Sequence, residues 1–203
     1  MVEMFGRANL LDNNYLSPRA TWKNAFTLEE VNKIKKLKTS NKFTRGVVDL
    51  GDSSFEEKDS VRKSSIFFFE KSDETFWMFD KINKCCDRTN KEFFGFDIYE
   101  SYKAQYTSYD HSTSDFYRYH WDIFATKTGE HPQRKLSVVL QLSDPESYEG
   151  GSLMLNEGGV VYGSEKTIGS LIFFPSWVVH AVEPVTKGIR ESLVFWFEGP
   201  NWR

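Results

Sequence analysis

Residues 171–180 read LIFFPSWVVH, and this stretch decides the fold class. An apolar run from Leu171 to Phe174 ends at Pro175, and a second short apolar segment follows that carries one histidine, His180. Short apolar runs bounded by turn residues are typical of buried β-strands. The stretch therefore predicts a strand, a turn and a second strand inside a β-rich core.

The same pattern of short apolar segments and turns extends from about residue 96 to residue 203. Apolar or alternating segments are separated by turn signals such as Gly150-Gly151 and Lys187-Gly188. The predicted strands are 96–109, 116–124, 135–142, 152–155, 160–162, 169–174, 178–184 and 190–197. Eight short strands suit a jelly roll, also called a double-stranded β-helix, because two packed sheets leave few exposed edges.

The chain before residue 96 has a helical pattern instead. Thr27 and Glu30 have the spacing of a capping box, and a second helix is expected over about 73–90. The residues expected on the buried helix faces are Leu28, Val31, Ile34 and Leu37, then Phe76, Phe79, Ile82 and Cys86. With short strands at 47–50 and 65–69, we expect a mainly β (α+β) fold whose N-terminal helices pack on one sheet.

Length and composition favour one domain over residues 1–203. We divide it into an arm at 1–20, a helix and strand support region at 21–95, and a jelly-roll core at 96–203. The formal net charge is -3, so no nucleic-acid partner is expected. Because neither a signal peptide nor an apolar run of about 18–20 residues is present, we expect no membrane contact. The adjacent pair Cys85-Cys86 cannot staple distant segments, and it fits a reducing, cytoplasmic location.

Residues 116–122, which read FYRYHWD, carry the first metal-binding signal. On a strand, His120 and Asp122 point to the same face, so both can hold one ion. A His-x-Asp pair alone is weak, and an ordinary core or surface histidine is the simpler interpretation. His180, on a later strand, supplies a third ligand, and the set matches the two-histidine, one-carboxylate site of non-haem iron enzymes.

Arg190 lies ten residues after His180 and opens another apolar strand. A hairpin brings it back beside the strand of His180, and Ser192 shares its face. Arginine binds carboxylates with two parallel hydrogen bonds. Beside a metal site, Arg190 is therefore predicted to anchor a carboxylate, with Ser192 adding a hydroxyl.

Together these motifs resemble the prolyl-4-hydroxylase-like branch of the Fe(II)/2-oxoglutarate oxygenases. The resemblance covers most of the chain, and the ordered set is far more specific than any single motif. The matching pieces are Ala25–Glu30, Arg62-x-Ser64-x-Ile66, Gln105–Tyr109, Phe116-Tyr117-x-x-His120-x-Asp122, Leu136–Ser143, Tyr148–Leu153, Gly169–Pro175, His180–Val185 and Arg190-x-Ser192.

The resemblance implies a hydroxylase that uses Fe(II), 2-oxoglutarate and O2, with ascorbate as a supporting reductant, and that releases succinate and CO2. It implies a proline residue in a peptide or protein as the substrate, and a monomer or dimer. Tyr109 and Gln141 are implied at the co-substrate, although some relatives have a tyrosine where Gln141 stands. Tyr117, Arg134 and Trp196 are implied at the substrate. Trp196 could equally be a core aromatic, and Arg134 an ordinary loop charge.

Several other interpretations stay open. Tyr119 and Trp121 alternate to the other strand face, where we expect them to pack. The loops at 41–60 and 110–115 could shape the substrate entrance, and His111 and His131 are not assigned to the metal. A hydroxylase of a free amino acid or other small molecule is the nearest alternative. A nucleic-acid demethylase, a non-catalytic cupin-like binding module and a metal-dependent hydrolase are more distant ones.

Overall fold

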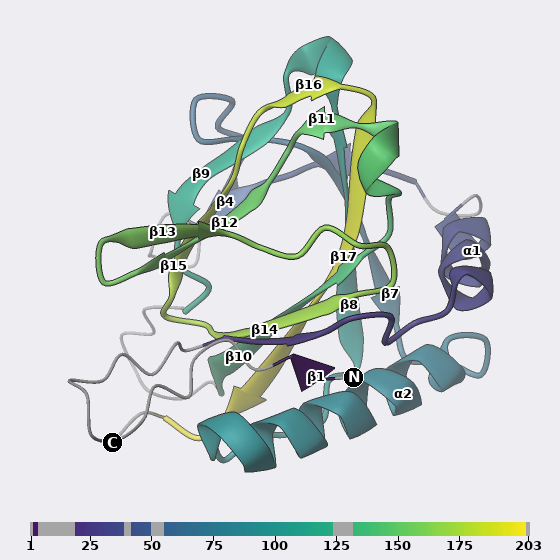
Figure 1. Ribbon diagram of the computed structural model, residues 1–203, viewed down its shortest axis with the longest axis vertical. Coiled ribbons are helices and arrows are strands. Elements are labelled where there is room, and N and C mark those ends of the chain that lie inside the picture. Colours follow the sequence, from purple (N-terminus) through teal and green to yellow (C-terminus); the bar gives the residue numbers. More distant parts are fainter. Residues whose placement is uncertain (1, 4–18, 39–41, 50–54, 124–131, 202–203) are drawn as a thin grey trace.

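The computed structural model describes residues 2–3, 19–38, 42–49, 55–123 and 132–201 (Figure 1). Most of the arm predicted at 1–20 lies outside the described residues, as do parts of the loop at 41–60 and His131. The described chain forms two antiparallel sheets and two α-helices. The jelly-roll expectation is confirmed.

Helix α1 (Leu28–Leu37) begins at the predicted capping box. The Glu30 amide donates to Thr27 Oγ1 at 3.2 Å, and the Thr27 amide donates to Glu30 Oε2 at 2.7 Å. These bonds satisfy two amides that a helix start would otherwise leave unpaired. Helix α2 (Phe76–Thr89) is followed by one π-helical turn (Asn90–Phe94). Within the described part of the chain, no helix combines the length and apolarity needed to span a membrane.

The predicted buried faces of both helices hold except in their first turns. Val31 and Ile34 of α1 are fully buried, as are Phe79, Ile82 and Cys86 of α2. Leu28 and Phe76 were expected on the same faces, but they are 60% and 53% exposed. In each helix the buried stripe begins one turn later, and the Lys71 ammonium lies 5.5 Å from the exposed Phe76 ring. The prediction was wrong at these two positions because periodicity does not say where packing against a sheet starts.

The larger sheet lies against the helices, and the smaller sheet lies across the barrel from it (Figure 1). The strand order in the larger sheet is β1 (Val2–Glu3), β2 (Ala20–Trp22), β14 (Leu171–Pro175), β10 (Gln133–Gln141), β17 (Ile189–Gly199), β8 (Lys103–Asp110), β7 (Ser65–Glu70), β3 (Thr44–Arg45). The order in the smaller sheet is β13 (Val160–Gly163), β12 (Leu153–Glu157), β15 (Val179–Val182), β9 (Phe116–His120), β6 (Arg62–Lys63).

Short ladders complete the structure. Strand β4 (Val48–Asp49) pairs with β5 (Phe55–Glu56), where a strand was predicted at 47–50. Strand β11 (Glu149–Gly150) pairs with β16 (Val185–Lys187), which lies in a stretch that we predicted as a turn. Two 3-10 turns, His111–Thr113 and Pro145–Ser147, connect the strands.

The apolar run of residues 171–174 is explained by its position between two cores. Leu171 and Phe173 belong to the core between the larger sheet and the helices. Ile172 and Phe174 belong to the core between the two sheets. Because both faces of β14 are covered, the strand is continuously apolar rather than alternating.

Gly169 precedes β14 and touches the entry to α1. Its φ is +77°, and a Cβ added there would lie 2.1 Å from the Phe26 carbonyl oxygen. The Phe26 amide donates to the Gly169 carbonyl at 2.9 Å. Gly169→Ala is therefore expected to lower the free energy of unfolding by about 2 kcal/mol or more, from backbone strain and the weakened hydrogen bond. Urea denaturation measures the change.

Gly95→Ala is the matched control for this prediction. Gly95 has nearly the same φ, +67°, but an added Cβ would meet nothing within 4 Å. It should cost only the strain of the left-handed backbone, about 1 kcal/mol. Equal losses in the two variants would show that the close approach at Phe26 contributes nothing.

Candidate active site

Two neighbouring strands of the smaller sheet position the three predicted metal ligands. His120 ends β9 and His180 lies on β15, where the two residues are paired across the ladder. Asp122 follows β9, and its amide donates to the Ser176 carbonyl at 2.8 Å. The ladder and this one hydrogen bond therefore bring the three side chains together from positions 60 residues apart in sequence.

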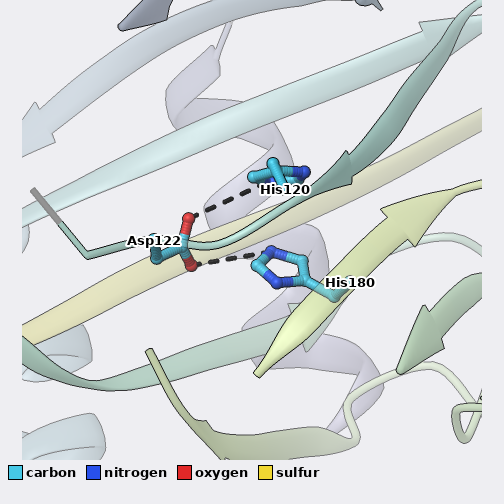
Figure 2. Close-up of side chains that lie close together, drawn as sticks. All are labelled: His120, Asp122 and His180. Atoms are coloured by element: carbon cyan, nitrogen blue, oxygen red, sulfur yellow. Dashed lines mark ion pairs between the residues drawn. The ribbon is translucent and has the colours of Figure 1, made fainter. Parts of the chain in front are cut away.

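The side chains converge as predicted (Figure 2). Asp122 Oδ1 lies 3.8 Å from His120 Nε2, and Asp122 Oδ2 lies 3.6 Å from His180 Nε2. One ligand atom from each of the three residues lies within 4.8 Å of the others. Such a group can hold one metal ion on a single face and leave the remaining positions open.

Hydrogen bonds and electrostatics prepare these groups for a metal. His120 Nδ1 lies 2.8 Å from the Arg118 carbonyl, and His180 Nδ1 lies 2.9 Å from the Val178 carbonyl. Because a carbonyl only accepts, each Nδ1 carries the proton and each Nε2 lone pair is free for the metal. Burial and the neighbouring His180 lower the pKa of His120, so it stays neutral. Burial opposes the charge of Asp122, but His180, His120, Arg134 and the Ser137 hydroxyl together outweigh it, and the pKa of that carboxyl is lowered.

Ser137 on β10 holds the carboxylate ligand, a contact that we did not predict. Its hydroxyl donates to Asp122 Oδ2 at 2.7 Å and lies 3.0 Å from the Ser176 hydroxyl. All of these groups are buried. A fixed carboxylate loses less freedom when it binds a metal, so Ser137 is a positioning residue. The one signal for it in the sequence is a lone serine within an apolar strand.

Ser137→Ala is expected to weaken metal binding about 10-fold, because the carboxylate loses its orienting donor. Titration of the purified chain with Co(II) measures the affinity. Ser176→Ala is the control, since its hydroxyl is one bond further from Asp122, and it should change the affinity less. Unchanged affinity in Ser137→Ala would exclude the positioning role.

Arg190 is fully buried, with 1% of its surface exposed. Its Nη2 donates to Gln141 Oε1 at 3.1 Å, while Nε and Nη1 have no hydrogen-bond partner among the described residues. A buried guanidinium with unpaired N–H groups costs folding free energy unless a ligand pairs with it. The side chain therefore fits an anchor for a bound anion.

The inward faces of three adjacent strands surround this guanidinium. Tyr109 of β8 is paired with Arg190 across the ladder, and its ring lies 5.6 Å from the guanidinium carbon. Burial raises the pKa of Tyr109, so its hydroxyl keeps its proton. Ser192 lines the same cavity. Gln141 uses both ends of its amide, because its Nε2 donates to the Glu165 carbonyl at 2.9 Å.

Arg190 lies on β17 of the larger sheet, so the prediction that a hairpin brings it beside the strand of His180 was wrong. The triad and Arg190 nevertheless open into one cavity of about 640 Å³. Tyr117, Arg134 and Trp196, the residues expected at the substrate, all line it. The Arg134 guanidinium carbon lies 3.8 Å from the Trp196 ring centre. The Tyr117 ring stacks on the His120 ring with centroids 3.5 Å apart. Nine of the ten predicted site residues thus line this cavity, and the tenth, Gln141, accepts a hydrogen bond from Arg190 beside it.

The expectation that Tyr119 and Trp121 pack was wrong. They are 52% and 61% exposed, and both line the cavity. The pairing of β9 with β15 shifts register between Tyr117 and His120, so strict alternation of faces cannot be assumed along this strand. His111 is also exposed, and it is not part of the metal-binding group.

These residues fit the groups that the resemblance implies. Two imidazoles and a carboxylate form the donor set that suits ferrous iron. The unpaired Nε and Nη1 of Arg190 suit the distal carboxylate of 2-oxoglutarate.

Comparison with known proteins agrees with this geometry. The family profile described as the 2OG-Fe(II) oxygenase superfamily matches residues 104–198, which include the triad and Arg190. A solved Pseudomonas putida prolyl-4-hydroxylase superposes with a TM-score of 0.69 at 18% identity, over 91% of this chain and 94% of that chain. A Trichoplax adhaerens prolyl hydroxylase, solved with a hypoxia inducible factor peptide, gives 0.68 at 18% identity over 89% and 83%. At this identity the likeness shows the shared fold.

Curated relatives match over a shorter stretch. The PKHD-type hydroxylase YbiX of Escherichia coli is 40% identical over 73 residues, which are 34% of this chain and 32% of that protein. The protein of the same name from Shigella dysenteriae matches equally. This chain therefore spans about a third of the length of the curated relatives that it matches.

Proposed function

We propose that this chain is an Fe(II)- and 2-oxoglutarate-dependent hydroxylase, starting from the match of residues 104–198 to the 2OG-Fe(II) oxygenase superfamily. Its proposed substrate is a proline residue in a peptide or protein, and its co-products are succinate and CO2. One observation carries the proposal: a cluster of His120, Asp122 and His180 shares a cavity with a buried guanidinium that has unpaired N–H groups.

The positions of the residues suggest which of them bind the metal and which bind 2-oxoglutarate. His120, Asp122 and His180 would hold the ferrous ion, and Ser137 would keep the carboxylate oriented. Arg190 and Ser192 would bind the distal carboxylate of 2-oxoglutarate, Gln141 would hold Arg190 in place, and the Tyr109 hydroxyl would donate near them. With Fe(II) and 2-oxoglutarate bound, the site would activate O2, and one oxygen atom would be inserted into a C–H bond of the substrate.

The cavity wall supports a proline ring as the reacting group. Tyr117, Trp196 and Val194 give flat or apolar surfaces next to the triad. The two solved structures compared above are named prolyl hydroxylases, and the two curated relatives are named PKHD-type hydroxylases. Cys85 and Cys86 are both free, which suits the reducing, cytoplasmic setting that belongs to the proposal.

The test is a hydroxylation screen with the purified chain, Fe(II), 2-oxoglutarate and O2. Proline-containing peptides and free amino acids are offered in parallel, and products are read by mass spectrometry as a gain of one oxygen atom. We expect succinate release that requires both Fe(II) and O2, together with oxygen on the proline of a peptide. Oxygen on free amino acids alone would overturn the peptide substrate, and absence of succinate would overturn the oxygenase.

A further inference from the structure

A second arginine in the cavity wall has no acidic partner. Arg62 on β6 is 6% exposed and lines the cavity. Its Nε donates to Ser64 Oγ at 2.8 Å, and its Nη1 donates to the Val47 carbonyl at 3.1 Å. In the described part of the chain, its other N–H groups have no partner and no carboxylate forms an ion pair with it. A buried cation without an anion costs folding free energy, so a functional partner is expected.

The surroundings of Arg62 hold the guanidinium in one place. Its carbon lies 4.6 Å from the Tyr117 ring centre, and the same ring stacks on His120. A Cβ added at Gly46 would lie 2.5 Å from Arg62 Nε and 2.4 Å from Ser64 Oγ, so only glycine leaves room for this arrangement. The Tyr117 ring therefore separates the fixed Arg62 guanidinium from His120, a proposed metal ligand.

The charges along the cavity favour an anionic occupant. Three arginines, Arg62, Arg134 and Arg190, line it with one carboxylate, Asp122. A ferrous ion and the 2-oxoglutarate dianion cancel each other, so the loaded cavity stays positive. Arg190 is assigned to 2-oxoglutarate, and Arg134 stacks on Trp196 and interacts electrostatically with Asp122, the carboxylate among the described lining residues. Arg62 is left as the cation available to a substrate.

We propose that the substrate carries a carboxylate and that Arg62 binds it at the cavity wall beside the metal. This inference rests on the proposed hydroxylase function and names the chemical class of its substrate. The carboxylate has two sources: the α-carboxylate of a free amino acid, or an acidic side chain next to the reacting proline in a peptide. Both present the same oxygens to the guanidinium.

The experiment measures binding with two pairs of probes that differ only in charge. L-proline is compared with L-prolinamide, and the capped peptide Ac-Asp-Pro-Gly-NH2 is compared with Ac-Asn-Pro-Gly-NH2. Titrations are run under nitrogen on the chain loaded with Mn(II) and 2-oxoglutarate. In at least one pair, we expect the carboxylate probe to bind about 10- to 100-fold more tightly than its amide, which is the range of a charged hydrogen bond. The pair that shows the preference identifies the source.

Arg62→Gln should remove this preference, and Arg62→Lys, which keeps the charge, should retain part of it. Arg45→Gln is the matched control, because Arg45 is the neighbouring arginine paired with Asp59 at the surface. Thermal melting and 2-oxoglutarate affinity verify that each variant is folded and loaded.

Equal affinity within both pairs, no binding by any probe, or a preference that survives Arg62→Gln would overturn the inference. Loss of charge preference in Arg62→Lys as complete as in Arg62→Gln would support the inference, since it would mean that the planar guanidinium, more than its charge, binds the carboxylate. Failure of the wild-type chain to bind Mn(II) or 2-oxoglutarate is a separate result, and it counts against the proposed function.

Discussion

His180→Ala is expected to abolish 2-oxoglutarate turnover and to weaken metal binding by more than about 100-fold. Substituting a residue that merely supports a metal ligand costs about 10- to 100-fold in affinity, so removing a ligand itself costs more. His180 is the residue that β15 contributes to the proposed metal site, and its Nε2 lies 3.6 Å from Asp122 Oδ2. Without it, one imidazole and one carboxylate remain.

Two measurements separate this loss from a loss of fold. Without metal, the melting temperature of the variant should stay close to that of the wild-type chain. The proposed role of the His180 ring is to bind the metal, so its loss should matter little to the metal-free fold. His111→Ala is the matched control. That histidine is exposed and its Nδ1 lies 3.1 Å from the Gly188 carbonyl, so metal affinity and turnover should be retained. Full turnover in His180→Ala would exclude the triad.

The fold and the triad could be predicted because both depend on local patterns. The stretch at 171–180 forms β14, a turn and β15, as its apolar run and proline indicate. The capping box places the start of α1. The spacing of His120 and Asp122, with a later histidine, is a pattern of side chains that a strand directs to one side.

Features that depend on contacts between distant segments could not be predicted. Ser137 orients Asp122 only because β10 lies across the barrel from the end of β9. Arg62 is part of a matching motif, but the motif does not indicate that its side chain is buried, since arginines are mostly exposed. Tyr119 and Trp121 line the cavity instead of packing, and the register shift between β9 and β15 is a feature that the alternation rule does not anticipate. The sequence therefore predicts the metal ligands better than the neighbouring residues that orient them or line the cavity around them.

Arg190→Ala is expected to weaken 2-oxoglutarate binding by about 100-fold or more while metal affinity stays within a few-fold. Two guanidinium nitrogens, Nε and Nη1, are buried and unpaired in the described structure, and a charged hydrogen bond contributes about 1.5–3 kcal/mol. Two such bonds correspond to at least about 100-fold in affinity. The measurement is calorimetric titration of the Mn(II)-loaded chain with 2-oxoglutarate under nitrogen.

Arg190→Lys tests whether charge or shape accounts for the binding. Lysine keeps the positive charge but cannot form two parallel bonds to a carboxylate, so we expect an intermediate loss, about 10-fold. It also gives up the fixed donor that now faces Gln141 Oε1. If both variants bound 2-oxoglutarate as tightly as the wild-type chain, the anchor would have to lie elsewhere in the cavity. Equal, complete losses in both would mean that the planar fork, more than the charge, selects the co-substrate.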